Sequence, residues 1–383
     1  MKPSIDIGAH MAHADHVITG IDCFPVLLRL RKPLVMSTYR IDDGPVLFVR
    51  IRTRGGHEGW GEAAASPVMS GETLVGMAAA VKEFIAPKLL GQSALDRARL
   101  SKAMRATVFA NGGAFAALDI ALLDLAGKIQ QVSVATLLGG ALRPAIQVLR
   151  LIGGSGDTSK DVAEAVELYQ QGFRAFKLKV AVAPVALEIA TVQQLRQALG
   201  PEALISADAN MGWDHSTALK FSKGVSDCSV AFIEQPLPAG DVARLANVAR
   251  LSEVPLGIDE SLHGLSDIFA HTQAQATHGV SLKSIKLGGI TPLVATAIVA
   301  DSIGLSVNLA MMMETGVATA AMVHAAAVIP QINWGLSLGT VWIADNPVAE
   351  PDCREGMVYV SDKPGLGVEV DVKVLESLRP RTT

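Results

Sequence analysis

Short apolar runs that each end in a polar or charged residue recur at a nearly constant spacing through the middle of the chain. The ends of the central runs, from Lys179 to Asn308, lie 24 to 29 residues apart. A helical pattern follows each run; in residues 158–172, Thr158 is placed to cap a helix and Gly172 to end it. The apolar runs span residues 145–151, 175–179, 204–208, 230–234, 254–259, 280–283, 305–308 and 332–336. Strands that alternate with helices predict repeated βα units and a parallel sheet.

Eight such units in about 200 residues fit a (β/α)8 barrel. The predicted fold class is therefore α/β, a (β/α)8-type barrel preceded by a different N-terminal unit. A solenoid has a similar repeat length and is the structural alternative. Solenoid strands would not each need a charged residue at the same end, so the barrel is favoured.

The two ends of the chain lack the repeat. Residues 17–31, 46–53 and 59–63 are predicted strands, and residues 72–90, 95–108 and 115–129 are predicted helices, which together make an α+β unit. Residues 341–383 contain a turn rich in Pro and Gly at 363–367 and no further βα unit. We expect an N-terminal α+β domain (1–140), a barrel (141–340) and a C-terminal segment (341–383) that packs back on the N-terminal domain.

Composition narrows the function classes. Of the 383 residues 50% are hydrophobic and only 18% charged, which excludes intrinsic disorder, and a net charge of −4 predicts no nucleic-acid partner. The apolar stretches 287–300 and 317–329 are shorter than the ~18–20 residues of a membrane span, so no membrane partner is predicted. Residues 1–16 lack the apolar core of a signal peptide, and Cys23, Cys228 and Cys353 lie far apart. A reduced, cytoplasmic chain is the simple interpretation.

The strand ends carry the candidate chemistry, because a barrel of this type places its active site at the C-terminal ends of its strands. In chain order the strand ends are basic, acidic, acidic, acidic and basic. The residues are Lys177 and Lys179; Asp208 and Asn210; Glu234; Asp259 and Glu260; and Lys283. Isolated charges are costly to bury, so five at matching positions should converge and neutralise one another.

Three carboxylates on adjacent strands make an all-oxygen site that suits Mg²⁺, with Mn²⁺ also possible, better than Zn²⁺. A substrate carboxylate on such a metal would have an acidified α-carbon proton, and the metal would stabilise the enediolate that forms. The flanking lysines would face each other across that substrate. A cation and a second lysine nearby would lower a lysine pKa so that it can act as a base. A salt-bridge network that merely closes the barrel mouth is the structural alternative.

Other candidates are weaker. Residues 153–156 (Gly-Gly-Ser-Gly) are a candidate phosphate loop without the Lys-Ser/Thr ending, and a plain βα turn is the simpler interpretation. Lys286 is either a substrate contact or a loop lysine, and Glu314 either polarises a catalytic lysine or caps a helix. His324 is expected in the core or an interface. His10, His13 and His16 are candidate metal ligands, with a solvated tail as the simpler interpretation.

At these residues the chain resembles the enolase superfamily, and within it the muconate-lactonizing-enzyme subgroup, over residues 17–379. Residues 176–179 (Phe-Lys-Leu-Lys) are similar to the Lys-x-Lys motif of the second strand, and residues 282–289 to the sixth-strand motif. The resemblance implies an N-terminal capping domain, a Mg²⁺-dependent isomerase and two lysine acid/bases. The implied acid/bases are Lys179 and Lys283, and the implied metal ligands are Asp208, Glu234 and Asp259.

The resemblance implies a half-reaction and leaves the substrate open. Taken as a whole, the amino-acid sequence most resembles those of cycloisomerases. Racemases or epimerases of N-acylated or N-substituted amino acids, or a related dehydratase, are the alternatives. No Asp-x-Asp follows the eighth strand, which disfavours a dipeptide epimerase, and residues 305–313 lack the histidine base of mandelate racemase. Two capping-domain loops, 33–44 and 64–72, are expected over the barrel mouth, where Tyr39, Arg40 and Met69 would contact a small carboxylate substrate.

Two further function classes stay open: a Schiff-base aldolase, which leaves the three carboxylates without a task, and a non-catalytic binding protein. The helices at 291–300 and 317–329 are apolar on the faces that would meet water in a monomer. Large exposed apolar patches mark interfaces, so a homo-oligomer is predicted.

Overall fold

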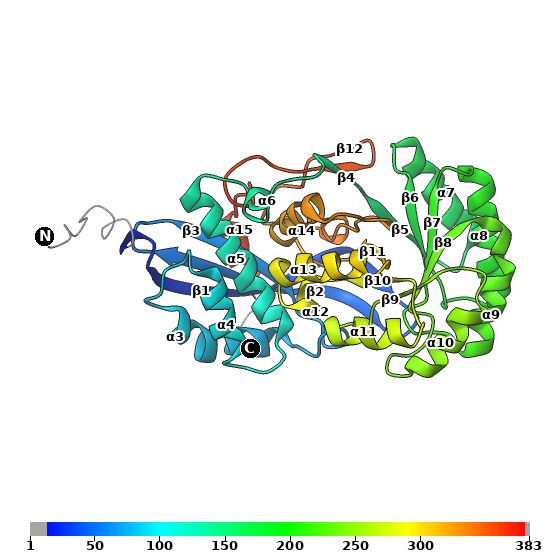
Figure 1. Cartoon of the computed structure of the whole chain (residues 1–383). Helices are drawn as coiled ribbons and strands as arrows, with labels where there is room; N and C mark the ends of the chain where they lie inside the picture. Colours follow the sequence, from blue (N-terminus) through cyan, green and yellow to red (C-terminus); the bar gives the residue numbers. More distant parts are fainter. Residues whose placement is uncertain (1–13, 380–383) are drawn as a thin grey trace, which may run out of the picture.

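The structure is a computed structural model that describes residues 14–379 and arranges them in three sheets (Figure 1). An antiparallel sheet of β1 (Ile18–Val35), β2 (Arg40–Thr53) and β3 (Glu58–Ala64) lies at the N-terminal end. Helix α5 (Gly112–Gln130) packs on this sheet, and a Cβ at Gly61 would lie only 1.8 Å from the Ala117 carbonyl oxygen. That glycine is therefore required for the close approach of helix and strand.

The remaining N-terminal helices follow the predicted order. Predicted residues 72–90 form one continuous helical stretch, made of α2 (Leu74–Ala79), a π-helical turn (Ala80–Ile85) and α3 (Ala86–Leu89). Helix α4 (Arg97–Arg105) comes next, and α6 (Val134–Leu137) follows α5.

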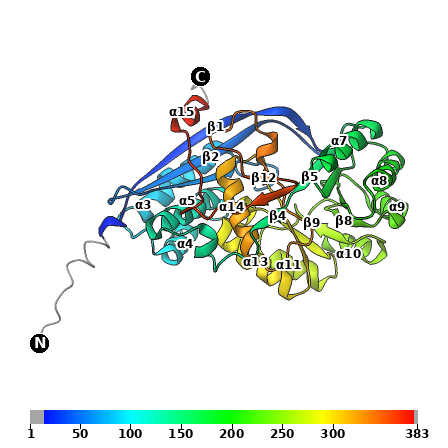
Figure 2. The same ribbon diagram turned by 90° about the horizontal axis from the view of Figure 1, so that it is seen from above.

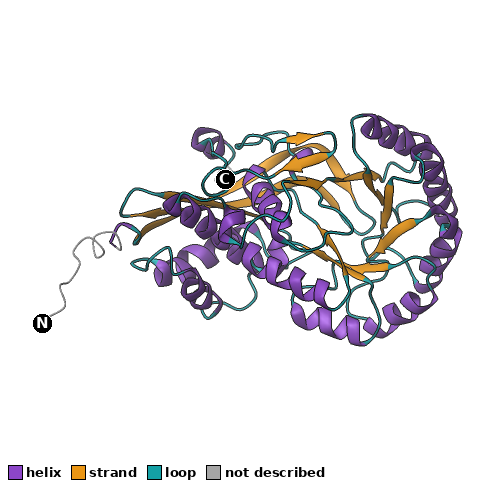
Figure 3. Ribbon diagram, turned by 45° about the horizontal axis from the view of Figure 1, so that its top comes forward, coloured by secondary structure: helices purple, strands orange, loops and turns teal. Residues whose placement is uncertain are grey.

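Seven parallel strands curl into the central sheet, with the helices around its outer side (Figure 3). Their spatial order follows the chain from β5 to β11. The strands are β5 (Leu149–Gly153), β6 (Ala175–Lys179), β7 (Leu204–Asp208), β8 (Val230–Glu234), β9 (Leu256–Ile258), β10 (Gly279–Leu282) and β11 (Ser306–Leu309). The helices are α7 (Thr158–Gln170), α8 (Val185–Leu199), α9 (His215–Gly224), α10 (Val242–Leu251), α11 (Leu265–Gln273), α12 (Ser284–Leu287), α13 (Ile290–Ser302) and α14 (Gly316–Val328).

The predicted eighth strand, 332–336, is wrong as an extended strand. Its place is taken by an irregular segment in which Leu336 makes single parallel bridges to Leu309 on one side and Val148 on the other. The Leu309 amide donates to the Gly335 carbonyl, and the Leu149 amide to the Leu336 carbonyl. The segment therefore links the two edge strands of the sheet with a few hydrogen bonds rather than a ladder.

The C-terminal segment contacts both the barrel and the N-terminal sheet. Strand β13 (Met357–Tyr359) pairs with β4 (Ala145–Gln147) on one side and with β12 (Cys353–Arg354) on the other. Helix α15 (Val372–Ser377) lies against β1, where the Leu27 amide donates to the Leu378 carbonyl at 3.1 Å (Figure 2). Asp124 of α5 accepts a hydrogen bond from the Leu366 amide at 2.9 Å.

The expected loop 33–44 is instead the tip of a long hairpin. Strands β1 and β2 stay paired as far as Val35 and Arg40, so only four residues turn. Figure 2 shows these two strands reaching from the N-terminal sheet to the barrel. Ser37 Oγ donates to the Ala209 carbonyl at 2.7 Å, which docks the hairpin tip on the chain that follows β7.

The faces of α13 and α14 differ from expectation. Along α14 every residue is buried except the half-buried Ala320, because β3, β4, α6, α13 and the C-terminal segment cover it. The expectation of an apolar α14 face in water is therefore wrong. Helix α13 does expose an apolar residue, Ile298, at 47%. The homo-oligomer stays a prediction that rests on α13. Within residues 14–379 no helix is long and apolar enough to cross a membrane.

Candidate active site

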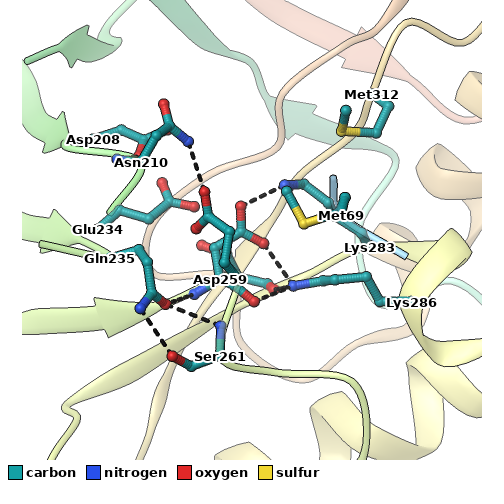
Figure 4. A network of polar contacts seen from close by, with 12 residues as sticks. Met69, Asp208, Asn210, Glu234, Gln235, Asp259, Ser261, Lys283, Lys286 and Met312 are labelled. Carbon is teal, nitrogen blue, oxygen red and sulfur yellow. Dashed lines mark hydrogen bonds and ion pairs between the residues drawn. The ribbon is translucent and has the colours of Figure 1, made fainter. Parts of the chain in front are cut away.

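Three buried carboxylates meet at one edge of the central sheet. Asp208 and Glu234 are the last residues of β7 and β8 and stand opposite each other in register, and Asp259 follows the end of β9. All three side chains point to the same cluster (Figure 4). Each residue is at most 3% exposed. The register of three parallel strands therefore builds the acidic centre that the strand ends predicted.

Four lysines surround these acids. Lys177 and Lys179 lie two residues apart on β6, so they share a face of the strand, and they pair with Glu234 and with Asp208 respectively. On the other flank, Lys283 follows β10 and Lys286 lies in α12. Both ammonium groups bind Asp259. Lys179 Nζ lies 2.6 Å from Asp208 Oδ2, and Lys286 Nζ lies 2.6 Å from Asp259 Oδ1.

Gln235, which the sequence did not single out, fixes the backbone of this centre. Its φ of +36° is in the left-handed region, which is unusual for a residue other than glycine. Its side-chain oxygen accepts from the amides of Asp259 and Ser261, and its amide nitrogen donates to the Leu237 carbonyl and the Ser261 hydroxyl (Figure 4). Four hydrogen bonds thus stabilise the turn that presents Glu234 and Asp259.

Burial and mutual charge shift the ionisation of the cluster. Burial disfavours the charge of Asp259, but Lys283 and Lys286 outweigh burial and hold its pKa well below the ordinary range. Burial raises the pKa of Glu234 despite Lys177. Burial opposes the charge on Lys283, but the negative charges nearby, Asp259 above all, outweigh burial and raise the pKa of Lys283.

The pKa values of two neighbours of Asp259, Glu260 and Lys286, are also shifted. Burial, followed by the charges of Asp259 and Asp208, raises the pKa of Glu260 to about 7. Asn210 donates to one oxygen of Glu260 at 3.1 Å, whereas the other oxygen is buried without a partner among the described residues. Burial also lowers the pKa of Lys286, more strongly than Asp259 raises it.

The donor set fits a divalent cation. Among residues 14–379, no group of three or more His, Cys, Asp or Glu side chains is arranged to hold a metal ion. Each of the three carboxylates is turned onto a lysine ammonium group. Asp208, Glu234 and Asp259 nevertheless offer buried oxygens toward one cavity, which is the donor chemistry that Mg²⁺ prefers. The predicted ligand set is thus chemically suitable.

A small cavity of about 40 Å³ lies beside the charged cluster. It is below the ~300–1,000 Å³ of typical small-molecule sites, because lysine and methionine side chains fill much of the space between the strand ends and the hairpin tip. Polar residues line one part of it: Lys177, Lys179, Asp208, Asn210, Glu234, Asp259 and Lys283. The remaining lining is Leu34, Met36, Tyr39, Leu151, Ala310, Met311, Met312, Met313, Ser337, Leu338 and Trp342.

The N-terminal domain brings two of its three predicted contacts to this site. Tyr39 lines the cavity, and burial raises the pKa of its hydroxyl. The sulfur of Met69 lies 3.9 Å from Lys283 Nζ, and His263 donates to the Met69 carbonyl. Arg40 is not brought to the site: its guanidinium binds Asp42 at 2.7 Å and its side chain is 57% exposed. The reason is that Arg40 and Asp42 lie on one face of β2, where they pair in solvent.

Glu314 is buried after β11 and accepts a hydrogen bond from the Met312 amide at 3.0 Å. It does not cap α14. That role belongs to Glu62 of β3, whose carboxylate accepts from the Thr315 amide and hydroxyl and from the Ala318 amide. A Glu between the small residues Gly61 and Ala63 of β3 was the available sequence signal for Glu62.

The weaker candidates have structural explanations. Residues 154–157 form a turn before α7, and the Asp157 carboxylate itself accepts from the first amides of that helix, where a phosphate would bind. His324 lies in the core, where its ring accepts from the Ala135 amide and donates to the Leu366 carbonyl. His10 and His13 lie outside the described residues.

Two family models match the chain. The model described as enolase C-terminal domain-like matches residues 160–374, and the mandelate racemase / muconate lactonizing enzyme N-terminal domain matches residues 18–139. Muconate cycloisomerase 1 of Rhodococcus opacus is 31% identical over 95% of this chain and 98% of that enzyme. The N-succinyl-L-Arg/Lys racemase of Bacillus cereus is 28% identical over 94% of this chain and 97% of the racemase.

Solved structures of enzymes of these kinds superpose closely on this chain. The muconate lactonizing enzyme from Pseudomonas fluorescens, complexed with muconolactone, superposes with a TM-score of 0.91 at 29% identity, covering 96% of this chain and all of that chain. The dipeptide epimerase from Cytophaga hutchinsonii, complexed with Mg and D-Ala-L-Val, superposes with a TM-score of 0.88 at 25% identity, covering 95% of this chain and 98% of that chain.

Proposed function

Because the chain belongs to the mandelate racemase / muconate lactonizing enzyme family of the enolase superfamily and is an isomerase, we propose that it abstracts the α-proton of a carboxylate substrate to give an enediolate. The R. opacus muconate cycloisomerase and the P. fluorescens muconate lactonizing enzyme support a muconate cycloisomerase-like reaction. The B. cereus racemase supports racemisation or epimerisation of an N-acylated amino acid as the second candidate.

The observation that carries the proposal is the placement of lysines on both flanks of the acidic centre. In the sheet, β7, β8 and β9 lie between β6, which bears Lys179, and β10, which precedes Lys283. A substrate on the three carboxylate-bearing strands therefore has a lysine on each side. A salt-bridge network that only closed the barrel would not need a cavity lined by both lysines.

The two lysines act as acid and base in this proposal. Each is at most 7% exposed, so bulk water does not compete for the proton at Nζ. Removal by one lysine and return by the other inverts the carbon, which is racemisation or epimerisation. When the proton transfer is coupled to ring closure or opening on one face, a single lysine suffices, which is cycloisomerisation.

The three carboxylates would hold Mg²⁺, which when bound would neutralise negative charge that develops on the substrate carboxylate. Asp208, Glu234 and Asp259 are its proposed ligands. Lys177 and Lys286 hold the carboxylates of Glu234 and Asp259 in place through their ion pairs. Tyr39 lines the substrate cavity, and Glu314 lies behind the lining, where it accepts a hydrogen bond from the amide of Met312.

Solvent-deuterium exchange tests the assignment of the lysines. NMR in D₂O should report exchange at the α-carbon of muconolactone or of N-acyl amino acids of either configuration. We expect Lys179→Ala and Lys283→Ala each to abolish exchange on one face, and the double variant to show none. Lys220→Ala, an exposed lysine of α9, is the matched control and should exchange at the wild-type rate. Full exchange by the double variant would refute the proposal.

A further inference from the structure

The cavity beside the proposed acid/base lysines has two chemically different parts. One part holds all of its charged residues, gathered around Asp208, Glu234 and Asp259. The other is apolar and rich in sulfur, with Met36, Met311, Met312 and Met313 beside leucine and tryptophan side chains. A substrate whose carboxylate lies at the charged part must therefore extend its remaining atoms into the apolar part.

Every cation of the cavity is already bound to an acid of the centre. Lys177, Lys179 and Lys283 pair with Glu234, Asp208 and Asp259. The apolar part contains no Arg, Lys or His among the residues that the structure describes. Nothing in the lining is thus available to neutralise a second negative charge.

Lys286, outside the lining, is bound to Asp259, and two cations that adjoin lining residues, Arg40 and Lys32, are also engaged. Arg40 binds Asp42 in solvent. Lys32 lies 5.8 Å from the ring centre of Trp342, but its side chain is 64% exposed and its ammonium group pairs with Glu164 at 3.9 Å. Neither side chain is buried against the cavity, so neither forms a built anion subsite.

We infer that the substrate is a monocarboxylate whose part distant from the reacting carboxylate is uncharged and apolar, an inference that rests on the proposed function. A carboxylate buried in the apolar part would lose its water and meet no cation, with only the hydroxyls of Tyr39 and Ser337 as possible donors, which is unfavourable for a full charge. Flexible methionine side chains instead adapt to apolar groups of varied shape. Muconate, with two carboxylates, and N-succinyl-arginine, with a cationic side chain as well, both match this part poorly. Because closure of a lactone ring needs a second carboxylate, the inference favours the second candidate, racemisation or epimerisation of an N-acylated amino acid.

Met311 is the position at which the preference for an uncharged distal group can be changed. It is half-buried, unlike Met312 and Met313, so an arginine at this position can reach the apolar part without being forced into the core. Met311→Arg supplies the missing cation and should favour substrates with a second carboxylate. Met357→Arg is the matched control, because Met357 is also half-buried but lies in β13, outside the cavity lining.

The experiment compares a matched pair of acids that differ in one distant charge. The pair is N-succinyl-L-phenylalanine, whose acyl group ends in a carboxylate, and N-butanoyl-L-phenylalanine, whose acyl group ends in a methyl group. Deuterium exchange in the presence of Mg²⁺ is measured by NMR for the wild type, Met311→Arg and Met357→Arg.

We expect the wild type to exchange the uncharged member of the phenylalanine pair at least ~10-fold faster, because a buried unpaired charge is rejected strongly. Met311→Arg should reduce or reverse that ratio, and Met357→Arg should keep it. Equal or faster exchange of the charged member by the wild type overturns this inference alone. An absence of exchange with every acid overturns the proposed function, and the inference falls with it.

Discussion

Glu62 should make the stability of the protein depend on pH between about pH 4.5 and pH 7. Its carboxylate is fully buried, and burial raises its pKa from the ordinary 4.5 to about 7. The charge of Glu314, the titratable group that faces it, adds to this rise, while hydrogen bonds from Ala318 and Thr315 oppose it. The perturbation that reveals this effect is Glu62→Gln, which keeps the shape and removes the titration.

The sign follows from the direction of the shift. A carboxyl whose pKa is raised in the fold is protonated in both states below pH 4.5 and ionised in both above pH 7. Between these values the unfolded chain loses the proton first, so folding becomes less favourable as pH rises. A rise from 4.5 to about 7 corresponds to roughly 3 kcal/mol of unfolding free energy, at ~1.4 kcal/mol per pKa unit.

The assay is urea unfolding followed by circular dichroism from pH 4.5 to pH 8 for the wild type and Glu62→Gln. We expect the wild type to lose about 3 kcal/mol relative to the variant across this interval. Glu58→Gln, at the half-buried start of β3, is the control and should show no such trend. A difference between wild type and Glu62→Gln that is constant within about 1 kcal/mol would refute the reasoning.

Three further substitutions test the fold and the site. Gln235→Ala removes four hydrogen bonds and should lower both kcat and the unfolding free energy, the latter by roughly 2–4 kcal/mol in urea titrations; wild-type kcat and stability would contradict this. Trp334→Ala removes a ring that stacks 3.9 Å from Phe232 and should cost roughly 3–5 kcal/mol of unfolding free energy, and a loss under about 1 kcal/mol would be inconsistent with that packing. Arg40→Ala removes an exposed pair with Asp42 and should leave kcat/KM within about twofold, whereas a large loss would place Arg40 at the substrate.

The sequence predicted the centre of the fold because each strand end is marked twice, by an apolar run and by a polar residue. Lys179, Asp208 and Glu234 are the last residues of their strands, as the pattern indicates. The segment at 332–336 carries the same apolar signal, but it joins its neighbours through single bridges of Leu336. Hydrophobicity records burial and does not record how many ladder hydrogen bonds a buried segment makes.

The sequence was less informative about residues that act through tertiary contacts. Arg40 has a charge suited to a substrate carboxylate, yet the hairpin places it beside Asp42 in solvent. Glu62 and Thr315 are 253 residues apart, so no local pattern reveals their hydrogen bonds. Gln235 has no distinctive sequence signal, because a glutamine after a strand can play many structural roles. Only the fold brings the amides of Asp259 and Ser261 to its side chain.

Metal dependence of α-proton exchange tests the central claim most directly. Protein stripped with EDTA and dialysed should show no deuterium incorporation into a carboxylic acid substrate, and added Mg²⁺ should restore it. The same treatment of Asp208→Asn and Glu234→Gln should leave exchange low at Mg²⁺ concentrations that saturate the wild type. Undiminished exchange by the stripped protein, or by both variants at those Mg²⁺ concentrations, would contradict the assignment of these carboxylates as the metal ligands of an α-proton-abstracting isomerase.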